Sequence, residues 1–220
     1  MNTRALLGCG VVAGPVFVAS FLLRGAVLAD YDPLRHPVSS LALGPAGWVQ
    51  SATFIGCGLL VVAFAVALHG PWGRLLIAVW GLSLVGAGVF VTDPVGGYPP
   101  GTPPLSGYTT SGLLHDLCAI ATLLALPPAC LILARRFGPA WTVYSLLTAV
   151  AFPALWILAG MGFEQNPSLV DLAGLFQRAA IITAWAWITA LAVTLRHGGP
   201  RPARTGTLAG LRRPPADPAP

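Results

Sequence analysis

Lysine is absent from this 220-residue chain, and charged side chains of every kind amount to only 9% of it. A soluble domain carries roughly 25% charged residues, because its surface has to face water. Hydrophobic residues make up 55% of the chain instead. This composition excludes a soluble enzyme, a disordered chain and a nucleic-acid-binding protein, and it predicts an integral membrane protein whose main partner is the lipid bilayer.

Cysteine is scarce too, and its positions exclude two kinds of site. The four cysteines lie in long apolar segments without C-x-x-C spacing, which argues against a disulfide framework and against a zinc–thiolate site. Signatures such as H-E-x-x-H and G-x-S-x-G are also missing, so no catalytic motif assigns a reaction. The sequence predicts no cofactor, with a divalent metal held by histidines and acids as the alternative.

Long uncharged runs predict the architecture. A helix needs about 20 residues to cross a hydrocarbon core of ~30 Å, and backbone groups in lipid must bond within their own segment. We therefore expect an all-α, polytopic membrane bundle of six transmembrane helices within residues 1–196. The expected spans are 5–24, 48–68, 75–92, 115–134, 140–163 and 177–195. Glycines within them are expected to let neighbouring helices approach closely, for example Gly56, Gly58, Gly81, Gly86 and Gly88.

Arginine predicts the orientation. With the N-terminus inside, only Arg24, Arg35 and Arg178 of the twelve arginines fall outside, in agreement with the positive-inside rule. Six of the seven acids fall on that outer side. We therefore expect a multi-pass protein of the cell membrane with both termini in the cytoplasm. Residues 197–220 are rich in proline and arginine, which predicts a disordered cytoplasmic tail.

Polar side chains gather at the expected outer ends of the helices. Ionisable groups at membrane depth are costly unless they pair or line a wet cavity, so they are candidates for function. A histidine oriented by an acid could act as a general base through a serine or water, and arginine could bind a phosphate or carboxylate head group. The catalytic candidates are His36, Asp93, His115 and Asp116, and the ligand-binding candidates are Arg24, Asp32, Arg35, Ser39, Glu164, Gln177 and Arg178.

Three of these outer segments carry a family resemblance. They read YDPLRHPVSSLALGPAGW over 31–48, GVFVTDPVGGYPPG over 88–101 and SGLLHDL over 111–117. They resemble the bacterial six-helix membrane family known only as domain of unknown function 998. Its pattern joins a Tyr/Pro/His/Ser stretch to a later Asp-Pro and a Gly-x-x-His. The matching positions are Tyr31, Pro33, His36, Ser39, Asp93, Pro94, Gly112 and His115, with a looser match at Gly174, Gln177 and Arg178. The resemblance implies the fold and shared outer-face residues, but no reaction.

Several functions fit this description. The favoured one is a membrane-embedded enzyme or binding protein for an amphipathic or lipid ligand that reaches the outer layer from the bilayer. A non-catalytic scaffold or sensor is the first alternative, and a small-molecule transporter is disfavoured because the spans carry few polar groups at mid-depth. An isoprenoid cyclase is a further alternative, in which tryptophans would stabilise a carbocation. Its candidate residues are Trp80, Trp156, Trp185 and Trp187. Oligomeric state and catalytic activity are left open.

Overall fold

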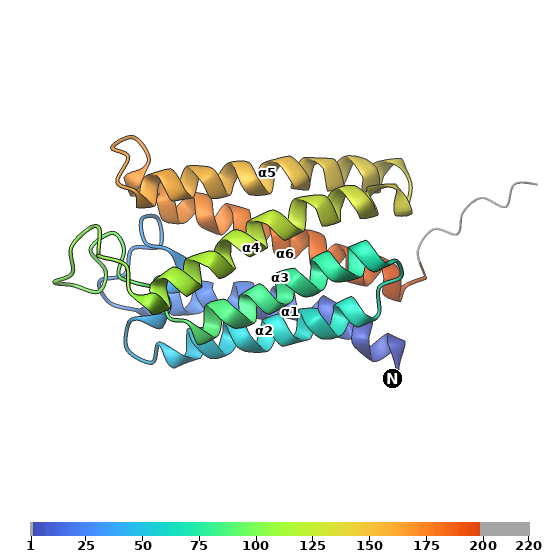
Figure 1. The fold of residues 1–220 in the computed structure, drawn as a ribbon, viewed down its shortest axis with the longest axis horizontal. Coiled ribbons are helices and arrows are strands. Elements are labelled where there is room, and N and C mark those ends of the chain that lie inside the picture. Colours follow the sequence, from blue (N-terminus) through green and yellow to red (C-terminus); the bar gives the residue numbers. More distant parts are fainter. Residues whose placement is uncertain (1, 199–220) are drawn as a thin grey trace, which may run out of the picture.

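The computed structural model describes residues 2–198, which are helical apart from loops and turns (Figure 1). The six long helices are α1 (Thr3–Val27), α2 (Trp48–Val66), α3 (Pro71–Val89), α4 (Thr110–Leu133), α5 (Pro139–Phe163) and α6 (Ala173–Arg196). The short 3-10 helices are η1 (Val38–Ala42), η2 (Ala134–Arg136) and η3 (Val170–Leu172). All six long helices are long and apolar enough to cross a membrane. The expected multi-pass helical bundle is confirmed, whereas most of the expected tail, 199–220, lies outside the described residues.

Five of the six long helices start earlier than the uncharged runs that predicted them, and α2 starts at Trp48 as expected. The fourth begins at Thr110 instead of residue 115, because the side chain of Thr109 caps it by accepting a hydrogen bond from the Gly112 amide at 3.0 Å. The sixth begins at Ala173 instead of residue 177. Polar residues at a helix end interrupt an uncharged run without interrupting the helix. His115 and Asp116 therefore lie inside α4.

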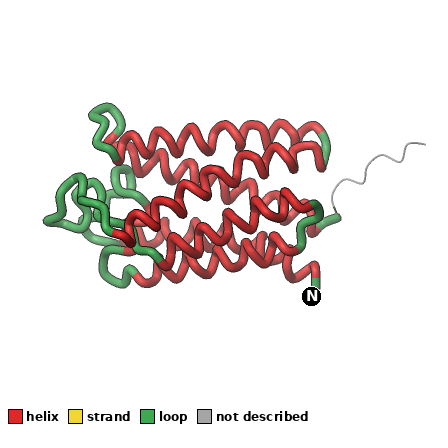
Figure 2. Tube along the Cα trace, in the orientation of Figure 1, coloured by secondary structure: helices red, strands yellow, loops and turns green. Residues whose placement is uncertain are grey.

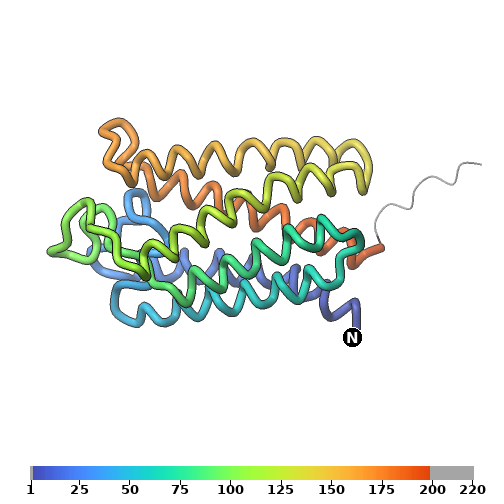
Figure 3. Tube along the Cα trace, in the orientation of Figure 1, coloured from blue at the N-terminus to red at the C-terminus, as the bar shows by residue number. Residues whose placement is uncertain are grey.

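The six helices form a closed ring. Each helix packs against its neighbours in sequence, and α6 returns to pack against α1. The chain alternates in direction, so the described ends of the chain lie at one end of the bundle, with the short connections 67–70 and 134–138 (Figures 2 and 3). We call this the termini end. The opposite, long-loop end carries the connections 28–47, 90–109 and 164–172.

Glycine sets the close approach of α2 and α3. A Cβ on Gly58 would lie 2.7 Å from the Gly81 carbonyl oxygen, and a Cβ on Gly81 would lie 2.9 Å from the Gly58 oxygen. Gly86 and Gly88 likewise face atoms of neighbouring helices. The expected packing role is confirmed at these four positions. It is wrong for Gly56, which is exposed and whose Cβ would meet no atom within 4 Å.

The ring is less tightly closed between α4 and α5 than elsewhere. The two helices lie together at the termini end, where the Trp141 indole donates to the Leu133 carbonyl at 3.0 Å. Toward the long-loop end, α4 runs obliquely away from α5 and lies beside α3 (Figure 1). This divergence leaves room inside the long-loop half of the ring.

Candidate functional site

The ring of helices holds a cavity of about 450 Å³ in its long-loop half. Each long helix contributes lining residues, as do the connections 28–47 and 90–109. Glu164 and Phe152 both line it, and they are separated by about 18 Å of helix at 1.5 Å per residue. The volume lies within the range of about 300–1,000 Å³ that is typical of pockets for small molecules. The cavity is therefore both large and deep enough to hold a ligand.

The deep part of the cavity is aromatic. Its lining side chains there are Phe17, Phe54, Trp80, Phe152, Trp156 and Trp185. The Trp80 and Trp185 rings meet edge to face with centroids 4.7 Å apart, and this contact fixes the positions of both rings in the cavity wall. Trp187 does not line the cavity. Its Nε1 donates to the Ser145 hydroxyl at 3.0 Å, so the expected grouping of four tryptophans is wrong for this one.

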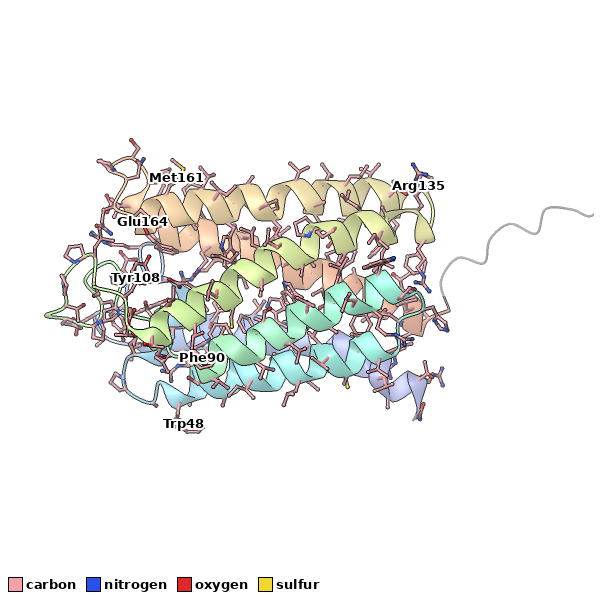
Figure 4. All side chains as sticks on the ribbon, viewed as in Figure 1. Trp48, Phe90, Tyr108, Arg135, Met161 and Glu164 are labelled. Carbon is pink, nitrogen blue, oxygen red and sulfur yellow. The ribbon has the colours of Figure 1, made fainter. Side chains whose placement is uncertain are left out.

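The end of the cavity nearest the long loops is polar. It is lined by Ser39, Thr92, Asp93, His115, Asp116, Glu164 and Gln177. Figure 4 shows two residues of the rim, Tyr108 and Glu164, at the long-loop end, opposite Arg135 at the termini end. The cavity is thus divided along the bundle axis into an aromatic depth and a polar mouth.

His115 presents one ring nitrogen to this mouth. Its Nδ1 lies 3.0 Å from the Ala87 carbonyl oxygen and 2.9 Å from that of Phe90, at the end of α3. Carbonyl oxygens only accept, so Nδ1 is the donor and carries a proton. Nε2 has no hydrogen-bond partner within residues 2–198, although the side chain is only 6% exposed. This nitrogen is left for a molecule in the cavity.

Two further buried side chains have polar atoms without a partner. The Gln177 carbonyl oxygen accepts from the Val38 amide at 2.7 Å, but its NH₂ group makes no hydrogen bond to the part of the chain that the structure describes. The Ser39 hydroxyl makes none there either. These side chains are 9% and 8% exposed, respectively. Buried polar groups are normally hydrogen-bonded, so these two groups on the cavity wall are available to bond a molecule inside it.

The three acids of the mouth differ in their surroundings. The Asp93 carboxylate accepts from the Thr109 amide at 2.8 Å and from its hydroxyl at 2.7 Å, which joins the end of the 90–109 connection to α4. Gly112 lies beneath it, where any Cβ would collide with the carboxylate. The carboxylates of half-buried Asp116 and exposed Glu164 make no hydrogen bond or ion pair with residues 2–198. Two carboxylates of the mouth are thus free to interact with a ligand.

A second polar cluster lies beside the cavity and is built around Arg178. This side chain is 6% exposed, and its Nη1 donates to the carbonyl oxygens of His36 and Gly174, both at 2.9 Å. Its Nη2 donates to the Tyr31 hydroxyl, which in turn donates to the Pro37 carbonyl at 2.9 Å. We call Tyr31, His36, Gly174 and Arg178 the arginine clasp. It fastens the connection 28–47 to the first turns of α6.

Arg178 was predicted to bind a ligand, but it does not line the cavity, and it has no carboxylate partner among the described residues. Backbone carbonyl dipoles and the faces of two rings satisfy the charge instead, with the guanidinium carbon 5.5 Å from the Tyr31 centroid and 5.9 Å from that of Phe21. Burial raises the pKa of the Tyr31 phenol to about 12, against the opposing effect of the arginine charge. Tyr31 therefore remains a protonated donor.

His36 belongs to the clasp and does not line the cavity. Its Nδ1 accepts from the Asp32 amide at 2.9 Å, so its Nε2 carries the proton and points to the Gly96 carbonyl oxygen at 3.3 Å. Both ring nitrogens are therefore used to join two connections. Burial lowers the pKa of His36, and the neutral ring is the form that can accept from Asp32. His36 and His115, both proposed as catalytic candidates, therefore do not share the cavity wall.

The remaining candidates also stabilise the long-loop end. Arg24 donates to the carbonyl oxygens of Leu41 at 3.2 Å and Pro45 at 3.0 Å. Asp32 accepts from the Leu34 amide at 2.8 Å. Arg35 lies 3.5 Å from Asp171 in an exposed ion pair. Of the predicted site residues, the cavity brings together Ser39, Asp93, His115, Asp116, Glu164 and Gln177, whereas Arg24, Asp32, Arg35, His36 and Arg178 lie outside it.

Sequence reasoning missed the phenylalanines of the cavity, because an aromatic residue in an apolar helix looks like ordinary packing. It also missed Leu105 and Tyr108, which belong to the proline- and glycine-rich connection 90–109 and line the rim. No group of three or more His, Cys, Asp or Glu side chains within residues 2–198 is placed to hold a metal ion.

A family model described as "Protein of unknown function (DUF998)" matches residues 11–194. The match extends from α1 to α6 and contains both the cavity and the arginine clasp. The resemblance drawn from the outer segments is confirmed. No curated protein and no solved structure matches the chain.

The arginine clasp predicts unequal effects of removing two arginines from the same end of the bundle. Arg178→Ala is expected to lower the free energy of unfolding by about 3 kcal/mol, because hydrogen bonds from a charged group contribute about 1.5–3 kcal/mol each. Arg35→Ala removes an exposed ion pair and is expected to cost about 0–1 kcal/mol. Thermal melts in a neutral detergent measure both. Equal melting temperatures for the two variants would contradict the role of the clasp.

The neutral state of His36 predicts a stability that falls on acidification. The unfolded chain takes up a proton near the ordinary pKa of 6.5, whereas the lowered pKa keeps the folded ring neutral. Stability from this group is complete above that pH and is lost as the pH falls toward the folded-state pKa. Between about pH 7.5 and about pH 5.5 the melting temperature should fall, and His36→Gln should melt lower at neutral pH with a flatter profile. Parallel profiles would contradict this.

Proposed function

This chain belongs to the DUF998 family of proteins of unknown function, and we propose that it binds an amphipathic ligand taken from the membrane into the cavity between its helices. The observation that carries the proposal is the division of one cavity into an aromatic depth and a polar mouth. Burial of an apolar chain stabilises a complex by about 25 cal/mol per Å². Polar groups at the mouth then fix the head group and its orientation.

Unpartnered polar atoms at the mouth support this proposal over a scaffold without a ligand, because they line a cavity, whereas those of Ser40 and Gln50 do not. A structural network satisfies its own buried groups, as the arginine clasp does with Tyr31 and the His36 carbonyl. Ser39, His115 and Gln177 instead each keep an atom that faces the cavity without a protein partner. Such groups match a ligand whose head both donates and accepts hydrogen bonds.

The divergence of α4 and α5 supports access from the lipid. Asp116 and Ala119 line the cavity from α4, and Trp156 and Gly160 line it from α5. These helices separate toward the long-loop end (Figure 1). The connection 90–109 covers the mouth with Leu105 and Tyr108. An amphiphile in the adjacent leaflet could therefore insert its chain sideways while its head stays level with the acids.

We further propose that the long-loop end faces the outside of the cell membrane. The described arginines of the termini end are Arg4, Arg74, Arg135, Arg136 and Arg196, and those of the long-loop end are Arg24, Arg35 and Arg178. Every acid among residues 2–198 lies at the long-loop end. The excess of arginine at the termini end favours its position in the cytoplasm. The cavity then opens to the outer leaflet.

An enzyme acting on the same class of molecule is the second candidate. Two features of the cavity favour it. His115 holds a proton on Nδ1 and keeps Nε2 unpartnered, which is the arrangement that a general base requires. Trp80, Trp156 and Trp185 line the same cavity as two free carboxylates, which is the combination that an isoprenoid cyclase would use to protonate its substrate and stabilise a cation. Both reactions begin with the binding proposed here.

The proposed orientation predicts the behaviour of a topology reporter. A reporter enzyme that folds only outside the cytoplasm should be active when it is inserted within residues 96–107, because this segment lies at the long-loop end. The same reporter fused after Arg196 should be inactive. Activity only in the second fusion would reverse the orientation.

Filling the cavity is expected to weaken ligand binding. The probe is ω-bromododecanol, whose terminal bromine should quench the tryptophans of the aromatic depth in a saturable manner. Gly160→Leu places a side chain in the cavity, where a Cβ meets no atom within 4 Å. It should weaken binding at least about tenfold through loss of buried apolar area.

The matched control is Gly56→Leu. Its Cβ also meets no atom within 4 Å, but it lies on the exposed face of α2. This variant should quench like the wild type. Equal weakening in the two variants, or quenching that never saturates, would mean that the probe only dissolves in the surrounding lipid.

A further inference from the structure

We infer that the ligand of the cavity carries a positively charged head of the ammonium class. The inference deepens the proposed function and rests on it. Its starting point is the sign of the charge around the cavity: Asp93, Asp116 and Glu164 line the mouth, and no arginine among residues 2–198 lines any part of it. Within the same residues, His115 is the only basic side chain on the wall.

The arginines of the long-loop end are directed away from the cavity. Arg178 donates to the His36 and Gly174 carbonyls, and Arg24 donates to the Leu41 and Pro45 carbonyls. Arg35 lies against Asp171 at the surface. None of them neutralises the acids of the mouth. The negative charge of the cavity therefore has no protein counterion among residues 2–198.

The two free carboxylates are placed where a head group would arrive. Asp116 lies in the second turn of α4, and Glu164 directly follows α5, so they stand on the two helices that diverge at the long-loop end. Neither makes a hydrogen bond or ion pair with the described chain. Like charges around one cavity repel each other, and an ammonium group between them would turn this repulsion into attraction.

The other groups of the mouth also suit a cation. His115 Nε2 has no hydrogen-bond partner within residues 2–198 and can accept a hydrogen bond from an ammonium N–H, as can the Ser39 hydroxyl. Both side chains are more than nine-tenths buried, at 6% and 8% exposure. Trp156 and Phe163 line the wall below and beside Glu164, and aromatic faces attract cations. The acceptor and ring positions therefore select the same sign of charge, and the Gln177 NH₂ group is left to donate to an acceptor elsewhere on the ligand.

An anionic head group is disfavoured by the same arrangement. A phosphate or carboxylate in the mouth would face three acids, and the arginines that could bind it are used by backbone carbonyls. We therefore expect the acids of the mouth to bind a cationic head group, in place of the earlier expectation that Arg24, Arg35 or Arg178 binds an anionic one. A protonated amine on an apolar chain is the class of ligand that fits.

Three probes with the same chain and different heads test the inference. These are ω-bromododecylammonium, ω-bromododecanol and ω-bromododecanoate, added to the protein in bilayer discs of zwitterionic lipid. Quenching of tryptophan by the terminal bromine reports binding. The ammonium probe should bind about tenfold more tightly than the alcohol, and the carboxylate should bind most weakly. Raising the salt concentration should reduce the preference, because ions screen the carboxylates.

The second part of the test neutralises the two free carboxylates by mutation. The Asp116→Asn, Glu164→Gln double variant should bind the ammonium probe about tenfold more weakly and the alcohol as the wild type does. The control is the Asp30→Asn, Asp171→Asn double variant. It removes two exposed acids from the same end of the bundle but none from the cavity, and it should keep the preference.

The outcomes separate the inference from the proposed function. Equal affinities of wild-type protein for the ammonium probe and the alcohol, or tighter binding of the carboxylate, would overturn the inference and leave an amphiphile-binding cavity. An ammonium preference that survives in the Asp116→Asn, Glu164→Gln variant would also overturn it. Absence of saturable quenching by all three probes would overturn the proposed function as well.

Discussion

The buried charge of Arg178 is the constraint on which the long-loop end depends. A guanidinium that is 6% exposed must be hydrogen-bonded, and this one is satisfied by the His36 and Gly174 carbonyls and the Tyr31 hydroxyl. Glycine is required at 174, because a Cβ there would lie 2.6 Å from the His36 oxygen. With the backbone fixed at this point, Gln177 accepts from the Val38 amide, and Ser39 becomes part of the cavity wall.

The same constraint explains how the charges of this end are divided. Arg24 and Arg178 donate hydrogen bonds to backbone carbonyl oxygens of the loops. Two of the acids at the cavity, in contrast, have no side-chain partner within residues 2–198. The residues that stabilise this end are therefore different from those proposed to bind the ligand. His36 and His115 differ in the same way. Both ring nitrogens of His36 form hydrogen bonds with the backbone of the loops, whereas only Nδ1 of His115 bonds the backbone, at the end of α3.

The helices were predictable from the sequence, and much of the site was not. Uncharged runs identify six spans because lipid excludes charge, but they cannot show that α4 extends back to Thr110. A helix that is apolar on all sides does not reveal its inner face, so Gly56 and Gly58 looked equivalent and the cavity phenylalanines looked like packing. Acids and arginines at helix ends were equal candidates, because the carbonyls that Arg178 binds are assembled only by the fold.

A structure of the protein bound to ω-bromododecylammonium tests the central claim most directly, because bromine can be located by its anomalous scattering. The account predicts bromine in the aromatic depth among Trp80, Trp156 and Trp185, with the nitrogen between Asp116 and Glu164. Bromine found only on the outward-facing surface of the ring, beside residues such as Leu124 and Val150, would contradict it.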